Sequence, residues 1–302
     1  MRDQIIATIH KLMQQDKSAF FLTGDLGYSV LEKIQTDFPD RFLNAGIAEQ
    51  NLLGLATGLS LSFKRRVYVY SIIPFTTLRC AEQIRNDVCF HKAKVTILGI
   101  GAGLSYGILG STHFALEDIS LMRSFPNMKV LSPADGAEAS ELIKQTHNTD
   151  GPFYLRIDKS KASFFTKGEN FQLGQAKIIQ PVAPTTIIST GAITLEAAKA
   201  INELITSEVG LVHLGTIKPL DEQVLQQISQ QAKQVIVIEE HGKSGGLGEA
   251  VASFLSQQDT RPKLHHFFVD NYYHHQTGEQ AYLRQVHGLD SASLTKRISQ
   301  II

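Results

Sequence analysis

Residues 41–63 read RFLNAGIAEQNLLGLATGLSLSF, and this stretch is the most informative about the fold. Gly46 ends an extended run and permits a tight turn into a helix. Leu52, Ala56 and the apolar residues after them recur at helical spacing, which predicts a helix over 47–63. Glu49 heads this stripe, so its carboxyl group is expected to face a core or an interface, where loss of water favours the protonated form. On this feature alone, the favoured interpretation is simpler: Glu49 caps the start of the helix, where acidic residues are common.

Outward from this stretch, short β-branched or aromatic runs alternate with segments of helical period, a pattern typical of parallel α/β units. We expect two domains, each a mostly parallel sheet flanked by helices. Strands are predicted over 19–25, 65–72, 94–100, 128–134 and 152–157, and again over 185–191, 209–215, 234–240 and 264–270. Further helices are predicted over 75–91, 114–125, 137–147, 195–206, 221–230 and 247–256, and near the C-terminus.

A polar stretch with Pro181 and Pro184 separates the two series of elements and has no sustained period. We interpret it as a linker between the domains. The expected domain boundaries are therefore 1–160 for the first domain, 161–184 for the linker and 185–302 for the second domain.

The composition excludes several classes of protein. In 302 residues, 29 Lys and Arg balance 29 Asp and Glu, so no net field recruits nucleic acid or an anionic membrane. We find no signal peptide and no apolar run of membrane-spanning length, which predicts a cytoplasmic protein. Cys80 and Cys89 are the only cysteines, and their spacing suggests neither a disulfide framework nor a metal site.

Seven motifs in register across almost the whole chain resemble the thiamine-diphosphate-dependent transketolase family, its pyrimidine-binding domain followed by its C-terminal domain. They are NAGIAEQN, RCAEQIRND, GSTH with LEDISLMRSFPNMKVLSPADG, GPFYLR, TGAITLEAAKAINEL, HLGTIKPLDE and EEHGKSGGLGEA. The resemblance implies an enzyme that transfers a two-carbon ketol unit from a ketose or ketose phosphate donor to an aldose acceptor.

The resemblance also implies the residues that contact the cofactor. Glu49 matches the glutamate that hydrogen-bonds N1′ of the aminopyrimidine, which requires a carboxyl group of raised pKa in a dry site. Phe75 matches the aromatic that stacks on the pyrimidine, with a plain core phenylalanine as the alternative. Ile72 stands at the second aromatic position of the family, and Asp25 matches an aspartate near the cofactor, with a turn residue as the alternative.

Three residues match substrate contacts of the family. His113, directly before the helix predicted over 114–125, matches the histidine that contacts the sugar hydroxyls, although a lone histidine is more often structural. Ser29 and Arg156 match positions that bind the substrate phosphate. Their alternatives are a helix cap for Ser29 and an ion pair with Asp158 for Arg156.

The chain departs from the family at two places near these residues. Ile108 and Leu109 replace an acidic pair, and Gly101 replaces a histidine. Both an acid that orients donor hydroxyls and a cation-capable phosphate contact are therefore missing. We hypothesise a donor that is more apolar or differently substituted than the usual sugar phosphate.

The resemblance does not extend to the family motif that holds the diphosphate and its metal. The nearest candidate is Gly24, Asp25 and Leu26 with Asn51 downstream, and Leu26 prevents the close backbone approach that glycine allows. We therefore expect no metal ligands on this chain. A companion subunit is expected to hold Mg²⁺ or Ca²⁺ and the diphosphate, in an α2β2 split enzyme that is silent as a single chain.

Two other functions remain open at this point. One is the beta subunit of a 2-oxoacid dehydrogenase or a decarboxylating carboligase, which would release carbon dioxide from a 2-oxoacid. The other is a non-catalytic assembly or regulatory subunit, which would have no chemical reason to keep Glu49.

Overall fold

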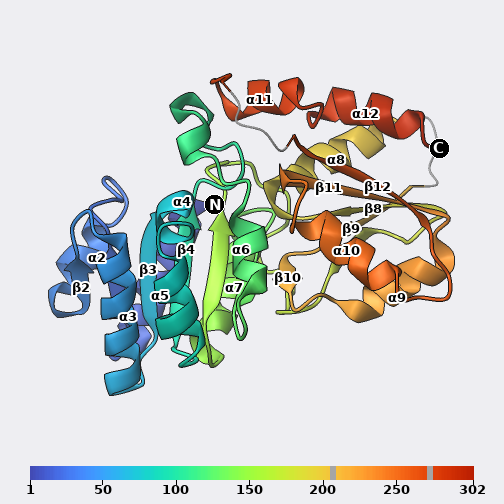
Figure 1. Cartoon of the computed structure of the whole chain (residues 1–302). Helices are drawn as coiled ribbons and strands as arrows, with labels where there is room; N and C mark the ends of the chain where they lie inside the picture. The colour runs from blue at the N-terminus through green and yellow to red at the C-terminus, as the bar shows by residue number, and fades with distance from the viewer. Residues whose placement is uncertain (205–208, 271–274) are drawn as a thin grey trace.

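The computed structural model describes residues 1–204, 209–270 and 275–302. Two sheets lie beside each other, and helices pack on the faces of both (Figure 1). This confirms the predicted α/β architecture of two mostly parallel sheets flanked by helices.

The first sheet has seven strands in the order β10-β5-β6-β4-β3-β1-β2, and every pairing is parallel except that of β10 with β5. Because side chains alternate across a strand, Val67 and Val69 enter one core while Tyr68 and Tyr70 enter the other. The strands are β1 (Phe20–Thr23), β2 (Phe42–Asn44), β3 (Val67–Ile72), β4 (Val95–Ile100), β5 (Lys129–Leu131), β6 (Phe153–Ile157) and β10 (Thr216–Lys218).

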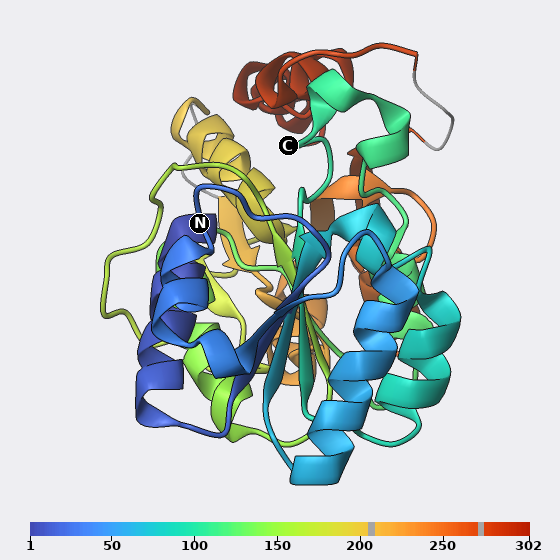
Figure 2. The same ribbon diagram turned by 90° about the vertical axis from the view of Figure 1, so that its left-hand side faces the viewer.

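Helices cover both faces of this sheet (Figure 2). The first core is formed with α1 (Arg2–Gln15), α2 (Glu32–Asp37) and α7 (Gly136–Asn148). The second core is formed with α3 (Glu49–Phe63), α4 (Ile73–Thr76), the π-turn Ile84–Cys89 that follows α5 (Ala81–Gln83), and α6 (Asp118–Ser124).

The second sheet has five strands in the order β12-β11-β8-β9-β7, with only β7 antiparallel to its neighbour. Its strands are β7 (Lys177–Gln180), β8 (Thr185–Ser189), β9 (Val209–His213), β11 (Gln234–Gly242) and β12 (Lys263–Val269). The helices that pack on it are α8 (Thr194–Asn202), α9 (Glu222–Gln231), α10 (Leu247–Leu255), α11 (Gln280–Val286) and α12 (Ser291–Ser299).

The two halves of the chain are joined by more than a linker. β10 follows β9 in the chain but pairs with β5 of the first sheet. Lys218 at its end donates to the carbonyls of Arg123 and Phe125, the latter at the C-terminal end of α6. One hydrophobic core runs from α3 and β3 through Phe125 to α9 and α10. The second half of the chain is therefore joined to the first by a strand pairing, by hydrogen bonds and by a shared hydrophobic core.

Three predicted elements differ from the structure. The helix predicted over 75–91 is interrupted, since the Thr76 and Thr77 hydroxyls donate to the Ile73 carbonyl and compete with helical bonding. The helix predicted over 114–125 begins only at Asp118, because Ala115 pairs with Gly103 instead. β7 lies inside the range predicted as linker.

Other elements were not anticipated: α1, α2 and the short strand β10. The extended run expected before Gly46 is observed as β2. The helix predicted over 195–206 is observed as α8, and its last predicted residues, 205–206, lie outside the described residues. None of the helices in the described part of the chain combines the length and apolarity that a membrane crossing requires.

Candidate active site

The residues singled out from the sequence gather near one edge of the first sheet. Asp25 and Ser29 follow β1, Ile72 ends β3, and Phe75 lies in α4 directly after it. His113 lies in the segment after β4. Parallel strands present their carboxyl ends at a common edge, where ligands of open α/β sheets bind. The topology therefore brings together residues that are far apart in the sequence.

Glu49 is the first residue of α3 and is only 3% exposed. No side chain caps this helix, and the carboxylate instead accepts a hydrogen bond from Arg79 Nη1 at 2.6 Å. Glu49 is therefore an acidic residue of the first helical turn, as the simpler alternative states, but its side chain does not cap the helix with a hydrogen bond. Arg79 compensates a buried negative charge that would otherwise be costly, while its own side chain remains 46% exposed.

Phe75 and His113 extend this pair into a continuous cluster. The guanidinium of Arg79 lies 4.6 Å from the centre of the Phe75 ring, and that ring meets the His113 ring edge-on at a centroid distance of 5.3 Å. Burial lowers the pKa of His113 below its ordinary value, so the imidazole is neutral at neutral pH. Its Nδ1 is 3.0 Å from the Thr112 hydroxyl. Contacts thus run from Glu49 through Arg79 and Phe75 to His113, and the buried Ile72 ends β3 directly before the helix that carries Phe75.

His113 does not lie directly before a helix as predicted. It ends the short 3₁₀ turn Ser111–His113, and four extended or turn residues separate it from α6. The histidine therefore belongs to a loop whose position depends on its contacts rather than on a helix terminus.

Asp25 adopts a left-handed backbone conformation with φ of 56°. Its carboxylate accepts hydrogen bonds from Asn44 Nδ2 and the Tyr28 hydroxyl, both at 3.1 Å. Asn44 Oδ1 in turn accepts from the backbone N–H groups of Asp25 and Gly46. These contacts match the turn alternative, and they brace the chain just before Glu49.

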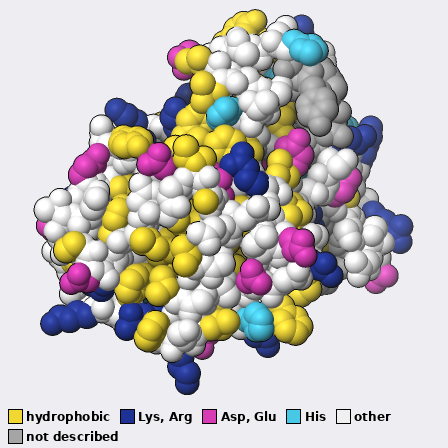
Figure 3. All heavy atoms as spheres, turned by 60° about the vertical axis from the view of Figure 1, so that its left-hand side comes forward, with side chains coloured by type: hydrophobic (Ala, Val, Ile, Leu, Met, Phe, Trp, Pro, Cys, Tyr) yellow, Lys and Arg dark blue, Asp and Glu magenta, His cyan; other side chains and the backbone are white. Residues whose placement is uncertain are grey.

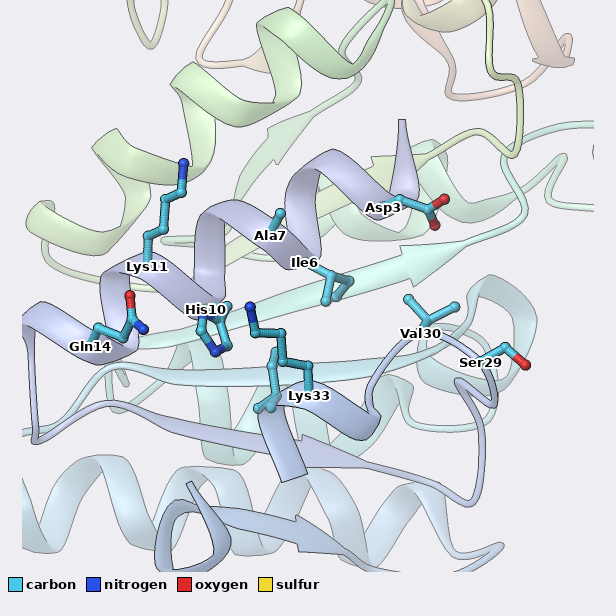
Figure 4. Close-up of a pocket in the computed structure, with 10 residues that line it drawn as sticks. Asp3, Ile6, Ala7, His10, Lys11, Gln14, Ser29, Val30 and Lys33 are labelled. Atoms are coloured by element: carbon cyan, nitrogen blue, oxygen red, sulfur yellow. The ribbon is translucent and has the colours of Figure 1, made fainter. Parts of the chain in front are cut away.

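Ser29 lies apart from the Glu49–His113 cluster. It lines a cavity of about 340 Å³ whose other walls come from α1 and α2, among them His10 and Lys33 (Figure 4). The alternative of a helix cap for Ser29 is not observed, since α2 has Leu31 at its N-cap and no side-chain cap bond. The Ser29 backbone N–H donates to Glu32 Oε1 instead, at 2.5 Å.

Arg156 is not brought to the surface of the site. It is buried in β6, where Nε donates to Asp118 Oδ2 at 2.8 Å and Nη2 donates to the carbonyls of Ala115 and Glu240. Arg156 does form an ion pair, as the alternative stated, but its partner is Asp118 rather than Asp158. In this arrangement the guanidinium holds segments of the protein and does not face a substrate phosphate.

The two departures from the family have distinct physical consequences. A Cβ atom at Gly101 would lie 2.2 Å from the Tyr106 ring. The Tyr106 ring therefore occupies the space that a side chain at position 101 would need. The Tyr106 ring is 6.2 Å from the His113 ring, and the Lys159 ammonium lies 4.3 Å from its centre. Ile108 and Leu109 are 64% and 52% exposed.

Sequence reasoning missed Arg79, Tyr106 and Lys159 as neighbours of the site. Arg79 stands inside the RCAEQIRND motif, which was a usable signal. Tyr106 and Lys159 carried no signal, because a single tyrosine in a glycine-rich loop and a single lysine after a strand are common surface residues.

Among residues 1–204, 209–270 and 275–302, no group of three or more His, Cys, Asp or Glu side chains is placed to hold a metal ion. Asp25 is engaged by Asn44 and Tyr28, and Asn51 is exposed on α3.

Known proteins resemble the chain in both halves. Residues 1–163 match the family described as "Transketolase, pyrimidine binding domain" and residues 174–294 match "Transketolase, C-terminal domain". An apulose-4-phosphate transketolase subunit of Actinobacillus succinogenes is 32% identical over 261 residues, covering 85% of this chain and 84% of that protein. A 6-deoxy-6-sulfo-D-fructose transketolase subunit of Clostridium sp. (strain MSTE9) is 27% identical over 305 residues, covering 100% and 94%. A solved structure described as a split gene transketolase in an inactive beta4 tetramer matches with a TM-score of 0.87 at 30% identity, covering 99% of this chain and 96% of that one.

Proposed function

Because the chain belongs to the transketolase family, we propose that it is the pyrimidine-binding subunit of a split transketolase. The enzyme would transfer a two-carbon ketol unit from a ketose or ketose phosphate to an aldose. The observation that carries this proposal is the buried Glu49 carboxylate beside the half-buried Phe75 ring and His113.

The residues of this cluster fit the pyrimidine half of thiamine diphosphate. Glu49 would hold a proton at N1′ of the ring, and Phe75 would stack on the ring with Ile72 as an apolar wall. Asp25 would act indirectly by bracing the turn before Glu49. When bound, the cofactor supplies the electron sink that C–C bond cleavage requires.

His113 would contact the hydroxyl groups of the sugar near the reacting centre. Its neutral ring can both donate and accept a hydrogen bond, which suits a hydroxyl partner.

For the substrate phosphate, Ser29 remains a proposed contact, and Lys159 is an exposed cation beside Tyr106. Arg156 would need to leave its buried partners before it could bind a phosphate.

We propose that a companion subunit holds the diphosphate and its Mg²⁺ or Ca²⁺, and that the two chains form an α2β2 enzyme in the cytoplasm. Exposed apolar side chains on and before α3 support such a partner: Leu43, Ile47, Leu55, Leu61 and Phe63. Figure 3 shows hydrophobic side chains gathered on this side of the first domain. The domain boundaries 1–160, 161–184 and 185–302 likewise stay a proposal.

The first test isolates the tagged chain from its own host with magnesium and thiamine diphosphate present, followed by native mass spectrometry. We expect a second chain and bound cofactor, and ketol transfer only from the complex. Ketol transfer by the purified single chain would contradict the split enzyme. Release of carbon dioxide from a 2-oxoacid would point to a decarboxylating enzyme instead.

The exposed Ile108 and Leu109 predict a donor other than xylulose 5-phosphate. In a panel of ketoses, we expect the best kcat/KM for a less polar or differently substituted donor. Leu109→Asp is expected to lower kcat/KM for that donor about 10- to 100-fold, as the apolar contact is replaced by a charge. Ile178→Asp is the control, since Ile178 is an exposed aliphatic residue on β7 in the second sheet. Xylulose 5-phosphate as the best donor would reject the hypothesis.

A further inference from the structure

The loop that carries His113 is closed at its base and leaves the first sheet after β4. The Ala115 N–H donates to the Gly103 carbonyl at 2.9 Å, which joins the two ends of the loop. His113 lies beyond this closure, in the 3₁₀ turn Ser111–His113. Figures 1 and 2 place this part of the chain beside α11 of the second half.

Glu240, at the carboxyl end of β11 in the second sheet, reaches across to this loop. Its side chain is buried, and Oε1 accepts a hydrogen bond from the Leu104 N–H at 2.7 Å. A Cβ atom at Gly103 would lie 2.4 Å from the same oxygen, so the loop can approach this carboxylate only because residue 103 is glycine.

Helix α11 completes the contact from the other side. Gln280 Nε2 lies 2.8 Å from both Glu240 Oε1 and Asp158 Oδ2, and 3.2 Å from Ser105 Oγ. Arg284 Nε donates to Glu240 Oε2 and balances its buried charge. The Ser105 hydroxyl also donates to Asp158 at 2.8 Å. One amide group thus ties the loop, β11 and the end of β6 together.

Two further contacts bind α11 and the residues just before it to the same loop. The Gly278 N–H donates to the Gly107 carbonyl at 3.2 Å. The fully buried Leu283 of α11 belongs to one hydrophobic core with Leu104, Phe114 and Leu116, which lie on either side of His113 in the sequence. The loop is therefore held by apolar packing as well as by the Glu240 network.

We infer that Glu240 and Gln280 are positioning residues, and that α11 holds the His113 loop in the geometry that the site requires. The inference rests on the proposed function where it makes His113 a substrate contact. It gives the second half of the chain a defined task, since β11 of its sheet supplies Glu240 and α11 supplies Gln280 and Arg284, which bind that carboxylate.

The test uses Gln280→Ala. Because glutamine is uncharged, this change removes the shared hydrogen-bond donor without altering the charge of the interior. Gln285→Ala is the matched control, because Gln285 is an exposed residue of the same helix. In hydrogen-exchange mass spectrometry of the full chain, peptides over 103–115 should exchange at least about fivefold faster in Gln280→Ala and unchanged in the control. Unchanged exchange in Gln280→Ala would overturn the inference.

A second measurement follows the His113 ring by NMR of histidine-labelled chain, with His113→Asn for assignment. The ring is faced by Phe75, Tyr106 and the Thr112 hydroxyl, with Arg79 and Lys159 behind the two aromatic rings. Burial keeps the pKa of His113 low, so a looser loop should move it up toward its ordinary value. A pKa equal to that of the wild type would again count against the inference.

Both measurements use the isolated chain, so they succeed or fail independently of transketolase activity. In the reconstituted complex, Gln280→Ala should lower kcat/KM for the donor while thiamine diphosphate binding is retained, and Gln285→Ala should match the wild type. Glu240→Gln keeps the size of the side chain but weakens the pair with Arg284. It should raise the hydrogen exchange of the loop as Gln280→Ala does. If the loop loosens in both variants and kcat/KM does not change, the loop is held by α11 but His113 is not positioned for catalysis, and the inference fails.

Discussion

Glu49→Gln is expected to lower kcat of the assembled enzyme about 10²- to 10⁴-fold, the usual range for a group that manages a proton in the reaction. Glutamine keeps the size of the side chain and can still accept a hydrogen bond from Arg79. It cannot hold the proton that the carboxyl group would share with N1′ of the cofactor. Steady-state kinetics of the complex, with native mass spectrometry to verify assembly, measures the effect.

Glu82→Gln is the control for this substitution, because Glu82 is an exposed glutamate of the nearby α5. It should leave kcat unchanged. Normal turnover of Glu49→Gln would favour a non-catalytic subunit that keeps the fold for assembly. Loss of turnover together with loss of the companion chain would instead show that Glu49 supports the interface.

Arg156→Met is expected to lower the free energy of unfolding by about 3–5 kcal/mol, the range for breaking a buried ion pair by removal of one partner. Asp118 would lose its arginine partner inside the protein. It would keep the hydrogen bond from the Tyr154 hydroxyl, and His241 Nε2 would remain 4.0 Å from its other carboxylate oxygen. The carbonyls of Ala115 and Glu240 would lose their shared donor as well. Urea denaturation of the isolated chain measures this loss.

Arg261→Met serves as the comparison, since Arg261 is exposed and its Nε donates to the nearby Gln258 carbonyl. Its effect should stay within about 0.5 kcal/mol, as is usual for surface substitutions. If Arg156→Met unfolded at the wild-type urea concentration and raised KM for a phosphorylated donor, Arg156 would be a substrate contact as the family resemblance implied.

The sequence alone was sufficient for the architecture and for the burial of Glu49. Alternating apolar strands and amphipathic helices follow from local periodicity. The observed strands β1, β3, β4, β5, β6, β8, β9, β11 and β12 lie within or closely overlap their predicted ranges. The burial of Glu49 at the head of an apolar stripe also follows from local spacing. Motifs in register then led to the family, to which both halves of the chain match.

The partners of the charged groups were decided only by the tertiary structure. Arg156 pairs with Asp118 and Glu49 pairs with Arg79 because strands and helices distant in the sequence meet at one sheet edge. β10 is too short to have a periodicity of its own, and it is a strand because β5 offers it an open edge. Local pattern determines which elements form and which face of each is buried. Which carboxylate meets which cation depends on how those elements pack against one another. The same packing lets Glu240 and α11 position the loop that carries His113.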